Sequence, residues 1–369
     1  MSEGLVRTFS FLVLIVVGLL LKSKIPADQR SGVKQIILSL ALPAVIFVSL
    51  HKVEFSLGLV LFPVLALLFN LILFSISGWL AKLAHIDGSQ TSRTARILLP
   101  SLAPGLSCFP FILEYLGEDS LANAAFADIG NKIFVLILLY IVAMRWYYQL
   151  HKIQEKSQRG RVKKFALIMA KEPVNLASMA ALILVGLGID YSVFPEFLQL
   201  GIDKLGLIMT PLVMIFIGLS VKLTWNHAKQ ILTMLMWRSA FSFLLSGTAI
   251  LIFNISDPAL LMLIVLFPQS SCSFWPYLHI ESVTVLESNM IDKKKTFDPT
   301  FALNILAVSL PFSTVIILSL ATFKEQVADS RTIFSLGGVI VLSLLISTFF
   351  RKFKNYAVAR VLANSNSNS

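Results

Sequence analysis

Runs of about 20 apolar residues recur along most of this chain, and short polar segments, many of them basic, separate them. A run of that length crosses the hydrocarbon core of a bilayer as an α-helix, because each residue advances the helix by about 1.5 Å. Hydrophobic residues form 56% of the sequence and charged residues 14%, which is more apolar surface than a soluble core needs. The sequence therefore predicts an all-α polytopic membrane protein. Eleven spans are expected, near residues 5–22, 34–51, 57–82, 94–117, 121–146, 166–189, 202–222, 229–253, 257–281, 299–322 and 332–350.

Basic residues are divided unevenly between the two sides of these predicted spans. The loops after odd-numbered spans and the carboxy-terminal tail carry 23 Lys and Arg residues, and the opposite side carries 5. Cytoplasmic loops are enriched in Lys and Arg, so the amino terminus is expected outside and the carboxy terminus in the cytoplasm. Topology thus accounts for the net charge of +11, and no nucleic-acid partner is expected.

Two predicted spans contain nearly the same motif. Pro104-Gly-Leu-Ser-Cys108-Phe-Pro110 lies in the fourth span, and Pro268-Gln-Ser-Ser-Cys272-Ser-Phe-Trp-Pro276 lies in the ninth. Pro104 and Pro268 are 164 residues apart, and so are Cys108 and Cys272, which are the only two cysteines of the sequence. Pro removes a backbone donor and interrupts a helix, so each motif predicts a broken helix. Paired interrupted helices in two halves of a membrane chain indicate a transporter binding site.

A similar offset relates two other spans. Pro43 in the second span and Pro211 in the seventh are 168 residues apart. Corresponding spans are five apart, and an odd number of crossings reverses direction, so the halves are expected to be inverted five-helix repeats. The expected division is residues 1–149 for the first repeat, 150–164 for a cytoplasmic linker and 165–325 for the second repeat. Residues 326–369 would form an extra transmembrane helix and a basic cytoplasmic tail.

Several segments resemble the auxin efflux carrier family, part of the superfamily that also holds bile-acid sodium symporters and arsenite transporters. They are Leu40-Ala-Leu-Pro43-Ala-Val-Ile-Phe47, Phe126-Ala-Asp128-Ile-Gly-Asn131 and Thr210-Pro211-Leu-Val-Met-Ile-Phe-Ile-Gly218-Leu-Ser220. The likeness covers roughly residues 10–322 and is to bacterial members, which implies the inner (plasma) membrane of a bacterium. It also implies that broken helices 4 and 9 cross at mid-membrane. The eleventh span departs from the ten helices of the family.

Candidate binding residues lie at the two breaks and in a polar cluster on the fifth span. Backbone groups freed at a break need a cavity, water, an ion or a substrate, and a half-helix that begins there favours an anion. The alternative for the Ser and Cys residues is that they only permit close helix contact. The predicted substrate-binding residues are Pro104, Gly105, Ser107, Cys108, Asp128, Asn131, Lys132, Ser270, Ser271, Cys272 and Asn304.

Lys132 is the central charge of this prediction. A lysine this far inside a span is a fixed cation that either attracts a carboxylate substrate or takes the place of a sodium ion. Asp128 is its expected partner, and the alternative is a plain structural ion pair one helical turn apart. Asn304 occupies the analogous position in the second half and is expected to face the same cavity.

These features favour a secondary active transporter, or permease, that moves a small organic anion such as a carboxylate by alternating access. A sodium-coupled organic anion symporter of the bile-acid type and a non-transporting membrane sensor are the alternatives. No enzyme activity, cofactor or metal site is expected, because the five histidines show no ligand spacing. The chain has no nucleotide-binding loop, so H⁺ and Na⁺ are the candidate coupling ions. The lipid bilayer is the expected surrounding, and a homodimer is a candidate assembly.

Overall fold

The computed structural model describes residues 3–52, 57–152, 167, 171, 173–220, 227–288, 290 and 294–347. Helices dominate this part of the chain and it contains no strand, so the predicted all-α class is confirmed. Most of the expected linker at 150–164 and the tail beyond residue 347 lie outside the described residues.

The α-helices are α1 (Glu3–Leu21), α2 (Ala27–Ile36), α3 (Leu42–Lys52), α4 (Leu61–Leu83), α5 (Ser89–Leu98), α6 (Pro104–Ser107), α7 (Phe109–Leu116), α8 (Glu118–Ile133), α9 (Leu139–His151), α11 (Pro173–Gly186), α12 (Glu196–Leu207), α13 (Met209–Ser220), α14 (Ala228–Ile252), α15 (Pro258–Leu266), α16 (Trp275–Ser288), α17 (Pro299–Thr322) and α18 (Lys324–Val327). Between them lie the π-helical turns η1 (Ile37–Ala41) and η3 (Phe134–Leu138) and the 3₁₀ turns η2 (Leu57–Val60), η4 (Tyr191–Val193) and η5 (Phe267–Gln269). A further helix covers Ser330–Ser347.

Seven described helical stretches are long and apolar enough to cross a membrane, which supports an integral membrane protein. They are Gln29–His51, Leu61–Leu83, Glu118–His151, Glu196–Ser220, Ala228–Ile252, Pro299–Thr322 and Ser330–Ser347. Three shorter apolar helices, Val6–Leu21, Pro173–Gly186 and Pro258–Gln269, fall inside three more of the expected spans. The expected fourth span is divided into α5, α6 and α7, so the total of eleven crossings stays a prediction.

Proline explains the irregular turn in the second expected span. Pro43 has no amide hydrogen to donate one turn back, and the turn before it widens into η1, where Leu42 donates to Ile37 instead. The helix continues through α3 without a break. A similar π turn, η3, follows Lys132 and joins α8 to α9.

We divide the helices into two groups, which contact each other where α3 packs on α8. In the first helix group, α1 and α2 pack on α13, and α11 and α12 pack on α3. In the second helix group, α4 packs on α8 and α5, α14 on α17, and α16 on α9. Glycine sets the closest approach in each group. A Cβ at Gly218 would overlap the carbonyl of Ile15 on α1, and one at Gly130 on α8 would overlap the carbonyl of Pro63 on α4.

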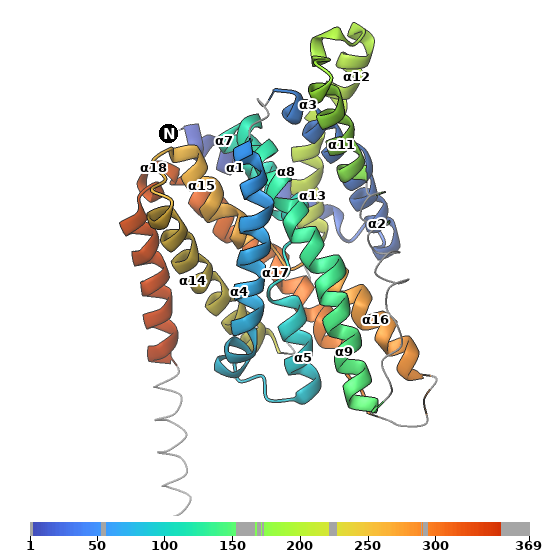
Figure 1. The fold of residues 1–369 in the computed structure, drawn as a ribbon, viewed down its shortest axis with the longest axis vertical. Coiled ribbons are helices and arrows are strands. Elements are labelled where there is room, and N and C mark those ends of the chain that lie inside the picture. The colour runs from blue at the N-terminus through green and yellow to red at the C-terminus, as the bar shows by residue number, and fades with distance from the viewer. Residues whose placement is uncertain are drawn as a thin grey trace, which may run out of the picture.

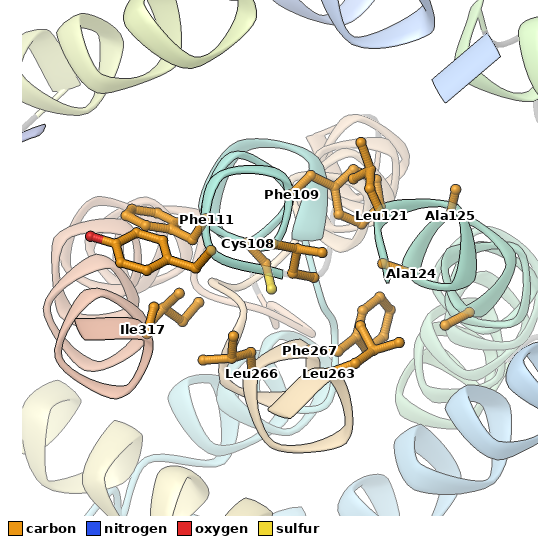
Figure 2. Packing of buried hydrophobic residues seen from close by; sticks show 14 of the residues in the cluster. Cys108, Phe109, Phe111, Leu121, Ala124, Ala125, Leu263, Leu266, Phe267 and Ile317 are labelled. Carbon is orange, nitrogen blue, oxygen red and sulfur yellow. The ribbon is translucent and has the colours of Figure 1, made fainter. Parts of the chain in front are cut away.

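The amino-terminal start of α1 and the end of the Ser330–Ser347 helix lie at opposite ends of the molecule (Figure 1). The α4–α5 connection and the ends of α9 and α16 lie at the same end as residue 347 (Figure 1). Phe109 of α7 and the preceding Cys108 pack against Leu121 of α8, Leu266 of α15 and Phe267 of η5 (Figure 2). This apolar packing fixes α7 and α15, the two helices that flank the breaks.

Candidate functional site

Both expected helix breaks are present, and each consists of a few extended residues next to a proline. In the first, α5 ends at Leu98 and α6 begins at Pro104. Cys108 then has non-helical backbone angles and separates α6 from α7. In the second, η5 ends at Gln269 and α16 begins at Trp275. Pro104 and Pro268 stand at the positions where an amide hydrogen is missing, so helix formation is interrupted there for a local reason.

Three hydrogen bonds join the two breaks directly. The amide of Ala103 donates to the carbonyl of Ser271 at 2.8 Å, and the amide of Ser271 donates to Oγ of Ser107 at 2.9 Å. The amide of Ser273 donates to Oγ of Ser101 at 3.1 Å. All these residues except Ala103 are buried, so some of the backbone groups freed by one break are satisfied by the other. Ser107 and Ser271 therefore form part of the contact between the breaks.

Asn131 on α8 holds the first break in place. Its amide nitrogen donates to the carbonyl of Leu102 at 2.9 Å and to Oδ1 of Asp128 at 2.8 Å. Its amide oxygen accepts from the side chain of Asn70 at 3.0 Å and from the amide of Leu102 at 3.3 Å. Since both ends of the side chain are engaged and it is 1% exposed, Asn131 fixes the backbone of the break rather than presenting a free amide to a ligand.

Arg238 on α14 binds the backbone of the second break, as Asn131 binds that of the first. Its guanidinium donates to the carbonyls of Ser270 at 2.5 Å and Pro268 at 3.4 Å, and Nη1 lies 3.7 Å from Sγ of Cys272. The neighbouring Ser239 donates to the side chain of Gln269 at 2.8 Å. Arg238 is 3% exposed, so a fixed buried cation is bound to backbone carbonyls of an unwound segment.

Lys132 and Asp128 form the ion pair expected one turn apart on α8. Lys132 Nζ lies 3.2 Å from Asp128 Oδ2, and both residues are 6% exposed. Lys132 also donates to Oδ1 of Asn175 on α11, at 2.9 Å. The ammonium group is thus already surrounded by oxygen ligands, and one of them comes from the first helix group.

A cavity of about 180 Å³ adjoins this pair, between the first helix group and the breaks. We call it the Lys132 cavity. Polar and charged side chains line it together with Leu38, Leu42, Leu102, Leu106, Val135, Val174, Leu278 and the rings of Phe274 and Trp275. Because α16 begins at Trp275, the positive end of that helix lies at the cavity wall. Such a site suits a small anion with an apolar body.

A second cavity, of about 400 Å³, lies on the other side of the same wall. We call it the Ser220 cavity. Ala103, Leu106, Lys34 and Phe274 line both cavities, so these residues form the wall between them. The Ser220 cavity is further lined by Arg30, Ser31, Phe216, Leu219, Ser220, Ser271, Cys272, Leu303, Leu306, Ala307 and Leu310.

The predicted binding residues fall into separate regions of the structure: the Lys132 cavity, the Ser220 cavity, the interior of the breaks and the helix packing around them. Those that line the Lys132 cavity are Pro104, Gly105, Asp128, Asn131 and Lys132. Those that line the Ser220 cavity are Ser271 and Cys272. Ser107 and Ser270 are buried in the breaks and bond to backbone there. Cys108 is buried in the apolar packing of Figure 2, and Asn304 lies half-buried on α17, so neither lines one of these cavities.

Sequence reasoning missed Lys34, Asn175 and Ser101 as parts of this region. By sequence, Lys34 is one of the 23 basic residues expected on the cytoplasmic side, yet it lies on α2 in the wall between the cavities. Asn175 and Ser101 are ordinary polar residues in their segments, and no local pattern marks them.

Comparison with known proteins gives one informative similarity. No protein-family model matches the sequence. The chain is 26% identical over 217 residues to a protein of Methanocaldococcus jannaschii named as an uncharacterized transporter. The match covers 57% of this chain and 66% of the relative's length, so it falls just short of two thirds of that protein. The printed name says only that this relative is a transporter, and the apolar helices described above support an integral membrane protein.

Proposed function

We propose that this protein is a secondary transporter that moves a small organic anion by alternating access. In this proposal the two breaks are the crossing point of inverted five-helix repeats, as in the auxin efflux carriers that the sequence resembles. The observation that carries it is the set of hydrogen bonds between Ala103, Ser107 and the second break, next to a cavity with a fixed cation. The plasma membrane of a bacterium is the proposed location.

The charge of the region supports an anion as substrate. Lys34 and Lys132 line the Lys132 cavity, and the start of α16 adds the positive end of a helix. Asp128 is the one acidic residue among the described residues of its lining. A carboxylate would gain charge-assisted hydrogen bonds in this setting. The leucines and aromatic rings of the lining would cover its apolar part.

Arg238 supports an organic anion permease over a sodium-coupled symporter. Carbonyls of unwound helix segments bind Na⁺ in coupled transporters. Here the carbonyls of Pro268 and Ser270 accept from the Arg238 guanidinium. A second cation beside a buried guanidinium would be repelled, so this break is poorly suited to a coupling Na⁺.

Transport by purified protein in proteoliposomes tests the proposal. Uptake of labelled mono- and dicarboxylates is measured under an inward Na⁺ gradient, an inward H⁺ gradient and no ion gradient. We expect saturable carboxylate uptake that does not depend on Na⁺. Ser107→Ala, which removes the acceptor of the Ser271 amide, should slow uptake. Ser282→Ala is the matched control, since Ser282 is exposed and bonds only within its own helix.

Folded, inserted protein that moves none of these carboxylates under any gradient would overturn the organic anion proposal. Uptake that requires Na⁺ would favour the sodium-coupled alternative.

A further inference from the structure

Lys34 differs from Lys132 in having no acidic partner among the described residues. It lies half-buried on α2, and its ammonium group lies over the ring of Phe274, whose centroid is 4.5 Å from Nζ. A cation over an aromatic face is held weakly compared with one paired to a carboxylate. The contact also joins the two helix groups, because Lys34 belongs to the first and Phe274 to the second break.

The other cations around the two cavities are already engaged. Lys132 is bound by Asp128 and Asn175. Arg30, the remaining cation in the lining of the Ser220 cavity, donates to the carbonyls of Ile25 at 3.0 Å and Lys22 at 2.7 Å. Neither Asp nor Glu lines the Ser220 cavity among the described residues. Among the described residues, Lys34 is therefore the cation of the wall for which the structure gives no oxygen ligand.

The charges and side chains around Lys34 indicate which kind of ligand could pair with its ammonium group. Charges in the Lys132 cavity cancel except for Lys34, since Asp128 neutralises Lys132. Within the Lys132 cavity, one uncompensated cation matches a monoanion. Leucines form much of the rest of its lining: Leu38, Leu42, Leu106 and Leu278 line the same space.

We propose that Lys34 binds the carboxylate of a small apolar monocarboxylate at the wall between the two cavities, exchanging the ring of Phe274 for the anion. This inference rests on the proposed function and assigns the substrate charge to Lys34 instead of Lys132. Since Lys34 lines both cavities, a ligand bound to it would lie between them.

Binding of [¹⁴C]benzoate to the purified full-length protein tests this assignment. Benzoate is chosen because it is a monocarboxylate with a small apolar body; benzamide, without the charge, and phthalate, with two charges, are the comparison ligands. We expect the wild type to bind benzoate more tightly than either. Lys34→Gln should weaken benzoate binding about tenfold or more, which is the loss typical of one charge-assisted hydrogen bond, and Lys34→Arg should retain most of it.

Lys24→Gln is the matched control, because Lys24 is exposed just before α2 and lines neither cavity. It should bind benzoate like the wild type. A thermal unfolding scan without ligand shows whether each variant is folded, and Lys34→Met supplies a second neutral variant if Lys34→Gln unfolds early.

The outcomes separate the two proposals. Wild-type binding that survives in folded Lys34→Gln and Lys34→Met overturns the role of Lys34 and leaves the organic anion proposal standing. Equal binding of benzoate and benzamide also overturns it, since the charge would then play no part. A wild type that neither binds nor transports any carboxylate overturns both.

Discussion

Lys132 on α8 donates to Asn175 on α11 at 2.9 Å, and this bond crosses from the second helix group to the first. The same ammonium pairs with Asp128 on its own helix at 3.2 Å. One buried charge thus links the polar cluster beside the first break to a helix that packs on α3. If the two helix groups move relative to each other, either the Lys132–Asn175 hydrogen bond breaks or α8 and α11 move together.

The Lys132–Asp128 pair should show strong coupling in stability. Lys132→Met leaves Asp128 as an uncompensated buried charge and should lower the free energy of unfolding by about 3–5 kcal/mol. The double variant Asp128→Asn/Lys132→Met should recover much of that loss, because no unpaired charge remains. Thermal and denaturant unfolding in detergent measure the stabilities of the wild type, both single variants and the double variant, which form a double-mutant cycle. Asp119→Asn, at an exposed position of the same helix, should change stability by about 1 kcal/mol at most.

Transport by the same variants separates a structural pair from a functional one. We expect the double variant to fold and yet lose most substrate flux, since Lys132 lines the cavity that we propose as the anion site. Wild-type flux through the double variant would show that the pair only stabilises α8.

Arg238 should be irreplaceable by lysine at the second break. Its planar guanidinium reaches the carbonyls of both Pro268 and Ser270, which a single ammonium cannot do in the same way. Arg238→Lys should therefore lower stability by about 1–3 kcal/mol. Unfolding of Lys229→Gln, an exposed change on the same helix, is the control. An Arg238→Lys protein as stable as the control would mean that the second break keeps its conformation without the guanidinium hydrogen bonds to Pro268 and Ser270.

Gly130 should tolerate no side chain. A Cβ there would overlap the backbone carbonyl of Pro63 on α4, and backbone cannot move aside as a flexible side chain can. Gly130→Ala should cost about 1–3 kcal/mol of stability by forcing α4 and α8 apart. Gly32→Ala on α2 is the matched control: no atom lies within 4 Å of its added Cβ, so the helix-favouring alanine should be neutral or slightly stabilising. Equal melting temperatures for the two variants would contradict the close approach.

The carboxy terminus should lie in the cytoplasm. The 23 basic residues assigned to that side exceed the 5 on the other, which predicts this orientation. A fluorescent protein that matures only in the cytoplasm, fused after Ser369, should fluoresce in whole cells. A dark fusion on a fully inserted protein would mean that the last helix does not cross or that the orientation is reversed.

The sequence by itself determined the helices and the sites where they break. Membrane helices can be predicted from composition because any apolar side chain is stabilised by contact with lipid, whatever its neighbours in the sequence. The breaks at Pro104 and Pro268 follow from a missing amide hydrogen, which is a property of one residue. The Asp128–Lys132 pair was predictable for the same reason, since residues four apart share a helix face.

Only the tertiary structure decided which polar groups meet across helices. Lys34 fits a cytoplasmic basic segment equally well by sequence, and its place in the cavity wall depends on the depth and rotation of α2. Likewise, the bonds of Asn131 to Asn70 and of Arg238 to Ser270 join segments more than 30 residues apart. Depth and rotation are set by the packing of whole helices, through contacts such as that of Gly218 with Ile15, and no local pattern encodes them.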